Sequence, residues 1–404
     1  MKIAIVGAGA SGMAAAIAAA SSGTNEVLLL ERQARVGRKL LSTGNGRCNL
    51  SNYHATGASG HYHGTDPHFS DYALGRADLN VAATLDWFAS LGLLAAAEDS
   101  GRLYPYSNMA GSVLDVLRFA LDHPNIELHT GCTVTGIRAK GHTFTVRTEA
   151  ESFTADAVIL AAGGAAGSKL GGVMDGYQLA KSLGHHRTAL YPSLVQLKTD
   201  PTYPRSLKGV KAQAAIRIRR GGETIAENSG EILFTEYGVS GPAIFDVSRA
   251  VATGGDDLVC ELDLLPEQDQ KETMSWLLRR QTAMAGRESQ TLLTGLFHTR
   301  LGQILCKSCG FTAQPAGSLS EDDLRRIAHT VHHFTLPITG TCGFDQAQVT
   351  AGGLRTDEFD PRTMQSRLVP GFYACGEVLD VDGDCGGYNL QWAWSSGRLA
   401  GMLE

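Results

Sequence analysis

The chain has 404 residues and a net charge of −6, from 35 Lys and Arg residues against 41 Asp and Glu residues. This acidic balance argues against a general attraction to nucleic acid or to an anionic membrane surface. The length predicts two or three domains, at about 150 residues for each domain. With 48 Gly but only 12 Pro residues, the composition favours an α/β protein with many tight turns over a disordered chain.

The 8 Cys residues are spread along the chain and predict reduced thiols rather than a disulfide framework. No secretory signal is expected, because residue 2 already belongs to a predicted strand. No apolar run approaches the roughly 18 residues that are needed to span a bilayer. We therefore expect a cytoplasmic protein that does not associate with a membrane.

The first 31 residues have the order of a dinucleotide-binding βαβ unit. Residues 2–6 predict a buried strand, an Ala-rich helix follows, and residues 27–30 predict a second strand that ends at Glu31. A carboxylate about 20 residues beyond the glycine motif is placed to accept hydrogen bonds from a ribose hydroxyl. An ordinary βαβ unit with a Gly-rich turn would leave Glu31 unexplained.

The glycines between the first strand and the helix have the spacing GxGxxG. Gly7 allows a tight turn, Gly9 lets the backbone approach a pyrophosphate, and Gly12 lets the helix pack closely on the strand. The N-terminus of the helix then faces the phosphates. The two strands, the helix and the terminal acid together predict a dinucleotide site.

The next elements follow from periodicity and composition. Residues 34–75 are rich in Gly, Asn, Ser and His and predict a long, functional loop. Apolar faces with helical spacing predict helices over residues 78–97 and 110–122. Two short strands, a hairpin, a buried strand and a helix are then expected at residues 126–129, 132–137, 143–154, 157–162 and 172–183.

The pattern changes near the middle of the chain. Residues 194–261 contain short alternating segments that predict an antiparallel sheet or a small barrel. Residues 266–333 have a helical pattern, and the alternation returns after Phe334. The last predicted elements are a strand over residues 371–376 and a closing helix over residues 388–403.

This order of elements predicts a discontinuous α/β fold. Residues 1–190 and 345–404 would form the dinucleotide-binding domain. Residues 191–265 and 334–344 would form an inserted β domain, and residues 266–333 would form a helical insert. A final strand that runs through a polar Gly turn into a helix is typical of the carboxyl edge of a parallel sheet, where ligands bind.

Two further segments favour FAD over NAD as the dinucleotide. Residues 37–39 and 43–49 form a Gly-rich cationic loop that can present N–H groups and Arg side chains to a pyrophosphate and a ring. Near the other end of the chain, Glu377 is placed where a ribityl chain could lie. Residues 386–391 begin a helix whose N-terminus would stabilise the anionic edge of a reduced flavin.

With these motifs the chain resembles the BaiN-like family of bacterial FAD-binding flavoproteins, which includes the branch named for aminoacetone oxidase. The resemblance covers essentially the whole length and includes residues 230–242, 349–353 and 382–397. It implies a glutathione-reductase-like Rossmann FAD domain, which carries an inserted antiparallel, barrel-like β domain and a small helical domain.

The resemblance also implies which residues bind FAD. Ser11 and Gly12 would face the pyrophosphate, and Glu31 would face the adenosine ribose. Val134 would meet the adenine through its backbone, and Glu377 would face the ribityl or pyrophosphate part. The full set of predicted cofactor-binding residues is Gly7, Gly9, Ser11, Gly12, Glu31, Arg32, Arg38, Lys39, Asn45, Gly46, Arg47, Val134, Ala162, Gly163, Gly376, Glu377, Gly387, Tyr388, Asn389 and Leu390.

Two local motifs have both a structural and a functional interpretation. Cys306 and Cys309 have CxxC spacing, but their helical context favours packing over a redox pair or half a zinc site, and we expect no metal. Arg217, Arg219 and Arg220 form a basic cluster. A strand edge protected by charge is favoured there over contact with RNA.

We expect an FAD-dependent oxidoreductase that acts on a small molecule by hydride transfer at flavin N5. Amine or amino-ketone oxidation and NAD(P)H-linked C=C reduction both stay open, with NAD(P)H or oxygen as a transient redox partner. The alternatives are an RNA uridine reductase that forms dihydrouridine and a flavin-binding protein without turnover. No catalytic residue is assigned, and a solvated loop is favoured for His54, His61, His63 and His68.

Overall fold

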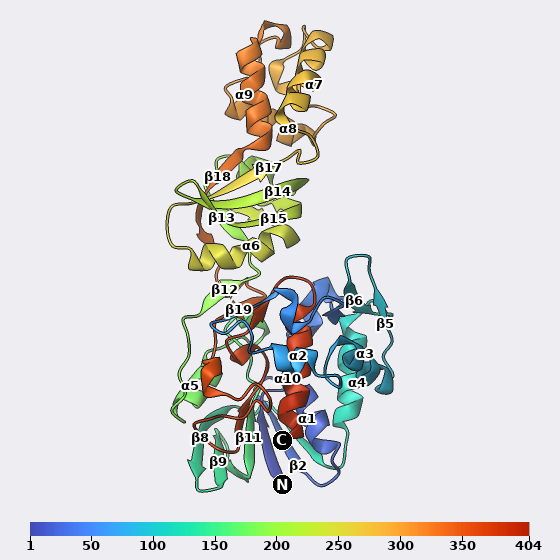
Figure 1. The fold of residues 1–404 in the computed structure, drawn as a ribbon, viewed down its shortest axis with the longest axis vertical. Coiled ribbons are helices and arrows are strands. Elements are labelled where there is room, and N and C mark those ends of the chain that lie inside the picture. Colours follow the sequence, from blue (N-terminus) through green and yellow to red (C-terminus); the bar gives the residue numbers. More distant parts are fainter. Residues whose placement is uncertain (404) are drawn as a thin grey trace. The chain divides into compact units, whose positions relative to one another are not determined.

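The computed structural model of the protein describes residues 1–403, which form two compact units. The first unit combines Met1–Tyr191 with the C-terminal segment from Gln348, and the second comprises Pro192–Ala347. In Figure 1 the blue N-terminal and the red C-terminal elements belong to the same unit. The predicted fold class is confirmed, because a discontinuous Rossmann-type domain carries an inserted antiparallel barrel and a helical segment.

A parallel sheet forms the centre of the first unit. Its strand order is β20 (Phe372–Ala374), β11 (Ala157–Leu160), β1 (Lys2–Val6), β2 (Glu26–Glu31) and β7 (Ile126–Thr130). Each neighbouring pair of these strands is parallel. A parallel sheet is covered on both faces, which is why β1 and β11 are nearly continuous apolar runs. Every residue of β11 is buried.

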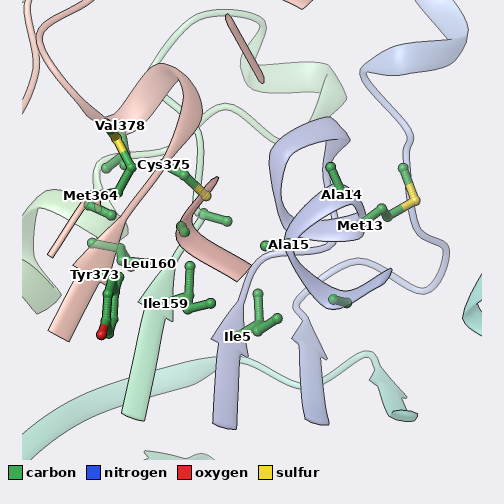
Figure 2. Close-up of a cluster of buried hydrophobic side chains, with 14 of the residues drawn as sticks. Ile5, Met13, Ala14, Ala15, Ile159, Leu160, Met364, Tyr373, Cys375 and Val378 are labelled. Carbon is green, nitrogen blue, oxygen red and sulfur yellow. The ribbon is translucent and has the colours of Figure 1, made fainter. Parts of the chain in front are cut away.

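Part of the core of this unit lies between the sheet and helix α1 (Ala10–Ala20). Figure 2 shows Ile5 of β1 and Ile159 of β11 in one cluster with Met13 and Ala15 of α1. All four side chains are fully buried. Burial of one Ile or Met side chain contributes about 1.5–3 kcal/mol. The cluster therefore fixes α1, and the glycine turn that precedes it, to the sheet.

Helix α10 (Tyr388–Met402) packs on α1 through small residues. A Cβ at Gly397 would lie 2.4 Å from the carbonyl oxygen of Ser11, and a Cβ at Gly401 would lie 2.4 Å from that of Ala15. Both distances are far below van der Waals contact, so glycine is required for this approach of the two backbones. The last helix of the chain thereby lies against the first.

The other elements of the first unit are short. Helices α2, α3, α4 and α5 comprise Asp71–Gly75, Val81–Ser90, Ala110–Leu121 and Asp175–Lys181. An antiparallel sheet contains β8 (Val134–Lys140), β9 (Thr143–Thr148) and β10 (Ser152–Ala155). The remaining strands are β3 (Ser51–Asn52), β4 (Tyr62–His63), β5 (Ala95–Ala97), β6 (Arg102–Pro105), β19 (Val349–Ala351) and β21 (Asp382–Gly383). Strand β12 (Tyr191–Ser193) includes the position at which the chain passes from the first unit to the second.

The prediction of one helix over residues 78–97 is wrong in its length. Helix α3 begins after Asn80, whose side chain accepts a hydrogen bond from the Ala83 N–H at 3.0 Å. The chain then turns at Gly92, whose φ of +91° lies in the left-handed region that ends helices. Residues 95–97 form strand β5 instead of a last helical turn. The long loop before α3 likewise contains β3, β4 and α2.

The second unit contains a closed antiparallel barrel and a group of helices. The barrel order is β13 (Leu197–Thr199), β16 (Gly238–Ser240), β15 (Glu223–Phe234), β14 (Lys211–Arg220), β17 (Leu258–Asp263) and β18 (Phe334–Thr341). Helices α6 (Pro242–Thr253), α7 (Gln270–Ala283), α8 (Thr299–Ser308) and α9 (Glu321–His332) complete it. Of the helices within residues 1–403, none has the length and apolar character required to cross a lipid bilayer.

Candidate functional site

The carboxyl edge of the parallel sheet gathers segments that are far apart in the sequence. Parallel strands end on the same side of a sheet, so the residues that follow β1, β2, β11 and β20 lie along one edge. Among the predicted site residues, those at or just after these strand ends are Gly7, Gly9, Ser11, Gly12, Glu31, Arg32, Ala162, Gly163, Gly376 and Glu377. The sheet thus brings together residues from both ends of the chain.

The three motif glycines have different surroundings. Gly7 has a φ of +102°, and a Cβ there would lie 2.5 Å from the carbonyl oxygen of Ala161. A Cβ at Gly12 would lie 1.8 Å from the carbonyl oxygen of Gly7, so the turn and the helix pack directly on each other. A Cβ at Gly9 would meet no atom within 4 Å. Protein packing therefore explains Gly7 and Gly12, whereas Gly9 borders open space.

The N-terminus of α1 is open to an anion. The helix begins after Gly9 without a side-chain cap and without an acidic residue in its first turn. The first N–H groups of a helix have no partner within the helix, and they carry the positive end of its dipole. A phosphate beside Gly9 would therefore find hydrogen-bond donors at a site where no side chain intervenes.

Glu31 lies at the end of β2 and is held by backbone groups. Its Oε2 accepts a hydrogen bond from the Ala8 N–H at 2.8 Å, and its Oε1 accepts one from the Gln33 N–H at 2.7 Å. A carboxylate oxygen accepts more than one hydrogen bond, so both oxygens keep capacity for a ribose hydroxyl. The Glu31 carbonyl accepts from the Cys132 N–H at 2.8 Å, which brings the start of β8, with Val134, to this edge.

Lys39 and Glu377, which lie 338 positions apart in the sequence, form an ion pair. The Nζ of Lys39 lies 2.7 Å from Oε2 of Glu377, whose Oε1 accepts a hydrogen bond from the Thr350 N–H at 2.9 Å. The two charged side chains are partly buried, at 31% and 21% exposure. The side chains of Arg32 and Arg38 are also held, by a backbone carbonyl and by a glutamine. The cationic loop is therefore tied to the turn after β20.

The rest of the cationic loop is an ordered turn. Residues 44–46 all have positive φ values, between 55° and 85°, and a Cβ at the last of them would meet no atom within 4 Å. Arg47 donates to Glu98 and to Asn108, each at 2.7 Å, and lies over the Tyr104 ring at 4.0 Å. The hydrogen bond to Glu98 raises the pKa of Arg47. Arg47 therefore anchors the loop through its own protein partners.

The N-terminus of α10 is a second uncapped helix end. It begins after Gly387, whose φ is +100° and where a Cβ would lie 2.3 Å from the Ser51 carbonyl oxygen. The nearby Oδ1 of Asn49 is buried and has no hydrogen-bond partner within residues 1–403. The side chain of Asn389 bonds both backbone groups of Gly383, at 2.7 and 2.8 Å, so it fixes the turn before the helix.

A cluster that the sequence did not predict lies beside α10; it comprises His61, His63 and Asp384 and is called the His61 cluster. Nδ1 of His61 lies 2.8 Å from Oδ2 of Asp384, and Nε2 of His63 lies 2.7 Å from its Oδ1. The antiparallel pairing of β4 with β21 brings these residues together. The His61 ring also stacks on Tyr388, with 4.4 Å between ring centroids. The expectation of a solvated loop is therefore wrong for His61 and His63.

The charge of Asp384 follows from its surroundings. Burial raises the pKa of this carboxyl, but the hydrogen bonds with His63 and His61 outweigh the burial, and the net pKa is lowered. The carboxylate is therefore ionised at neutral pH. Both imidazoles remain partly exposed, at 39% for His61 and 34% for His63.

A second histidine cluster, the His185 cluster, comprises His185, His186, Glu358 and Ser366. The two Nδ1 atoms of His185 and His186 each lie 2.8 Å from an oxygen of Glu358. Nε2 of His185 lies 2.9 Å from Oγ of Ser366, and the His185 ring stacks on a phenylalanine at 4.6 Å. Burial lowers the pKa of His185 despite its hydrogen bond to Glu358.

In the structure, the two cysteines of the CxxC segment are buried, and two arginines of the basic cluster form ion pairs. Cys306 is buried, which raises its pKa to about 12, and Cys309 is buried as well. Arg217 and Arg219 lie 3.4 and 2.9 Å from the carboxylate oxygens of the buried Glu261. Their strand, β14, lies between β15 and β17, so the prediction of a strand edge is wrong.

These features fit FAD at the carboxyl edge. Open space beside Gly9 and the uncapped α1 suit a pyrophosphate, and Glu31 keeps acceptor capacity for a ribose. The uncapped N-terminus of α10 suits the anionic edge of a reduced flavin. The buried, unpartnered Oδ1 of Asn49 is an acceptor that a ring N–H donor would satisfy.

Comparison with known proteins identifies the family. A family model described as HI0933-like protein Rossmann domain matches residues 1–403. The chain is 40% identical over 405 residues to the 3-dehydro-bile acid delta(4,6)-reductase of Clostridium scindens, with 99% of this chain and 98% of the relative covered. It is 29% identical over 395 residues to the ribosomal RNA dihydrouridine synthase of Escherichia coli, with 97% and 95% covered.

Among solved structures, the 3-ketosteroid delta1-dehydrogenase from Sterolibacterium denitrificans aligns with 99% of this chain and 98% of that chain, at 14% identity and a TM-score of 0.49. The family model matches almost the entire chain, and the first relative exceeds the identity at which a family is secure. The chain therefore belongs to the HI0933-like Rossmann family, as its motifs predicted, and its enzyme class is that of an FAD-dependent oxidoreductase.

Proposed function

We propose that the protein binds FAD at the carboxyl edge of its parallel sheet and uses NAD(P)H to reduce a C=C bond that is conjugated with a carbonyl group in a small molecule. The observation that carries this proposal is the 40% identity, over 99% of the chain, to a relative named as a reductase of 3-dehydro-bile acids. We further propose residues 1–190 and 345–404 as the FAD domain, residues 191–265 and 334–344 as the β insert, and residues 266–333 as the helical insert.

In the proposed complex, each part of the site has a separate task. Glu31 holds the adenosine ribose, and the N-terminus of α1 beside Gly9 holds the pyrophosphate. Lys39, paired with Glu377, balances charge between the phosphates and the ribityl chain. When bound, the reduced flavin supplies a hydride to the substrate. The N-terminus of α10 stabilises negative charge at the pyrimidine edge.

A second candidate is reduction of uridine in RNA. It is favoured by the relative named as a ribosomal RNA dihydrouridine synthase, which is 29% identical over 97% of the chain. The electrostatics disfavour it, because Glu261 pairs with both Arg217 and Arg219 and offsets one of their two charges, and because the net charge of the chain is −6. Both candidates add two hydrogens to a C=C bond, so they differ in substrate rather than in chemistry.

Anaerobic half-reactions separate the candidates. NADH or NADPH should bleach the flavin absorbance of the purified protein, and a 3-oxo-4,6-diene steroid should then restore it and gain two hydrogens. Restoration by a uridine-containing ribosomal RNA fragment alone would support the second candidate. Restoration by oxygen, with an amine or amino-ketone as the reductant, would contradict the proposed reduction of a C=C bond.

The proposed cofactor site has its own test. Gly9→Val places a branched side chain in the space beside the α1 N-terminus, and we expect the purified variant to lose most of its flavin. Gly286→Val is the matched control, because a Cβ at Gly286 also meets no atom within 4 Å but lies in the second unit. Equal flavin content in both variants would contradict the placement of the pyrophosphate.

A further inference from the structure

We propose that His61 donates the proton that completes reduction of the C=C bond, with Asp384 as its positioning residue and His63 as a second imidazole on the same carboxylate. The inference rests on the proposed function, because a C=C reduction requires a proton donor beside the hydride source. All three residues lie in the first unit, although His61 and Asp384 are 323 positions apart in the sequence.

Asp384 fixes which nitrogen of each imidazole carries a proton. An ionised carboxylate only accepts hydrogen bonds, so His61 donates from Nδ1 and His63 donates from Nε2. In neutral His61 the other nitrogen, Nε2, then has a free lone pair. Within residues 1–403 no hydrogen bond occupies that nitrogen. It can therefore take a proton from water and pass it to a substrate, as a general acid must.

The position of the His61 ring matches this role. Its stacking partner Tyr388 is the first residue of α10, whose N-terminus is the proposed site of the flavin edge. At 39% exposure, the imidazole is accessible to water for reprotonation. Tyr62 packs edge-on against Tyr388 and donates its hydroxyl hydrogen to the Tyr388 carbonyl at 3.0 Å. The contacts with Tyr62 fix Tyr388, and Tyr388 in turn supports the His61 ring on which it stacks.

Three other titratable groups lie against the cluster. They are Tyr62, Tyr388 and Asp382, from β4, α10 and β21. Burial raises the pKa of Tyr62 well above its ordinary value, and its hydroxyl hydrogen is already donated to the Tyr388 carbonyl, so Tyr62 is not placed to protonate a substrate. Within residues 1–403 no three His, Cys, Asp or Glu side chains are grouped to hold a metal ion.

The proposed step balances as follows. When bound, a flavin reduced by NAD(P)H would supply a hydride, with its two electrons, to one carbon of the conjugated C=C bond. The electron pair of that bond moves to the second carbon and the carbonyl. Protonated His61 then gives its Nε2 proton to the second carbon, so one N–H bond breaks and one C–H bond forms. Neutral His61 regains a proton from water, and Asp384 keeps its charge throughout.

The test uses the holoenzyme with the substitution His61→Asn. We expect reoxidation of the NADPH-reduced flavin by a 3-oxo-4,6-diene steroid to slow by about 100-fold or more. Flavin content and the rate of reduction by NADPH should equal those of the wild type. His68→Asn is the matched control, because His68 belongs to the same loop but its side chain is 82% exposed and pairs with Asp71 instead of Asp384. Its reoxidation rate should not change.

A second readout does not depend on turnover. In the flavin-free protein labelled with ¹⁵N, histidine spectra should show His61 protonated at Nδ1 and His63 protonated at Nε2, and Asp384→Asn should give mixed tautomers. Mixed tautomers in the wild type would overturn the positioning role of Asp384. Unchanged reoxidation in His61→Asn, or a large loss in His63→Asn alone, would overturn the assignment of His61. A wild type that the steroid cannot reoxidise would instead overturn the proposed function.

Discussion

The His61 cluster and the His185 cluster contain the same chemical groups in different surroundings. In each cluster, one carboxylate binds ring nitrogens of two imidazoles at 2.7–2.8 Å. The second nitrogen of His185 is occupied by Ser366, and the side chain of His185 is fully buried. The second nitrogen of His61 has no partner within residues 1–403, and its ring is partly exposed. An unoccupied nitrogen that water can reach, rather than the presence of a His–carboxylate pair, therefore distinguishes a proton donor from a structural contact.

Neutralising the two carboxylates tests this difference most directly. Asp384→Asn should slow substrate reoxidation by about 100-fold, while the free energy of unfolding changes by less than about 1 kcal/mol because the pair is partly exposed. Glu358→Gln should instead lower the stability and leave the reaction rate unchanged. Removing a buried charged acceptor should lower the free energy of unfolding by about 2–3 kcal/mol and leave the rate per bound flavin unchanged. Stopped-flow absorbance and chemical denaturation measure the two quantities, and the opposite assignment of effects would remove the distinction.

Ser366 should matter for stability alone. Its Oγ accepts hydrogen bonds from the N–H groups of Leu368 and Val369, at 3.0 and 2.8 Å, besides its bond to His185. Ser366→Ala leaves these partly buried groups unpaired, so we expect the free energy of unfolding to fall by about 1–2 kcal/mol. The exposed Ser318 offers a control, since Ser318→Ala should change it by less than about 0.5 kcal/mol. A loss of turnover per bound flavin in Ser366→Ala would show that the His185 cluster handles protons after all.

The His185 cluster should make the stability of the protein depend on pH. The folded pKa of His185 lies below its value of about 6.5 in an unfolded chain. The unfolded state then binds more protons below pH ~6.5, so this contribution is complete above that pH and is lost as the pH falls toward the folded pKa. The lowered pKa of Glu358 continues the loss at more acid pH. Denaturation at several pH values between 7 and 5 should show that the free energy of unfolding depends less on pH in His185→Gln than in the wild type. An equal pH dependence in the two proteins would refute this origin.

The smallest effect is expected for His186, which is the exposed residue of the His185 cluster. His186 bonds the same carboxylate as His185, but its side chain is 73% exposed. An exposed ion pair contributes little to stability, so His186→Asn should change the free energy of unfolding by less than about 0.5 kcal/mol. A loss as large as that for Glu358→Gln would mean that both imidazoles are needed to hold the carboxylate.

The glycine motif and the position of Glu31 were predictable because their determinants are local. The spacing of Gly7, Gly9 and Gly12 and the position of Glu31 are set within one βαβ unit. Gly7 and Gly12 have a steric reason and Glu31 has a hydrogen-bonding reason in the structure, whereas Gly9 borders open space. The change from parallel sheet to barrel was also visible in the pattern of apolar residues. The length of α3 could not be predicted. The apolar pattern with helical spacing continues past both ends of this helix, but the Asn80 cap begins the helix and the turn at Gly92 ends it.

The two histidine clusters could not be predicted from the sequence. The carboxylate of the His61 cluster lies 321 positions from His63, and the strands that join them, β4 and β21, are only two residues long. Glu358 lies 173 positions from His185. No local periodicity or spacing links such partners, so a histidine that is bound in the folded protein has the same sequence appearance as a solvated one.

The contact between α1 and α10 has a consequence for how the protein acquires its cofactor during synthesis. Gly397 and Gly401 lie against carbonyl groups of α1, and Gly387 begins the helix whose N-terminus is proposed to hold the flavin edge. During synthesis, the βαβ unit at residues 1–31 is complete long before the ribosome adds α10, which forms the proposed flavin half of the site. In the proposed site, the N-terminus of α10 supplies the flavin half, so we expect tight flavin binding to begin only after translation has passed α10.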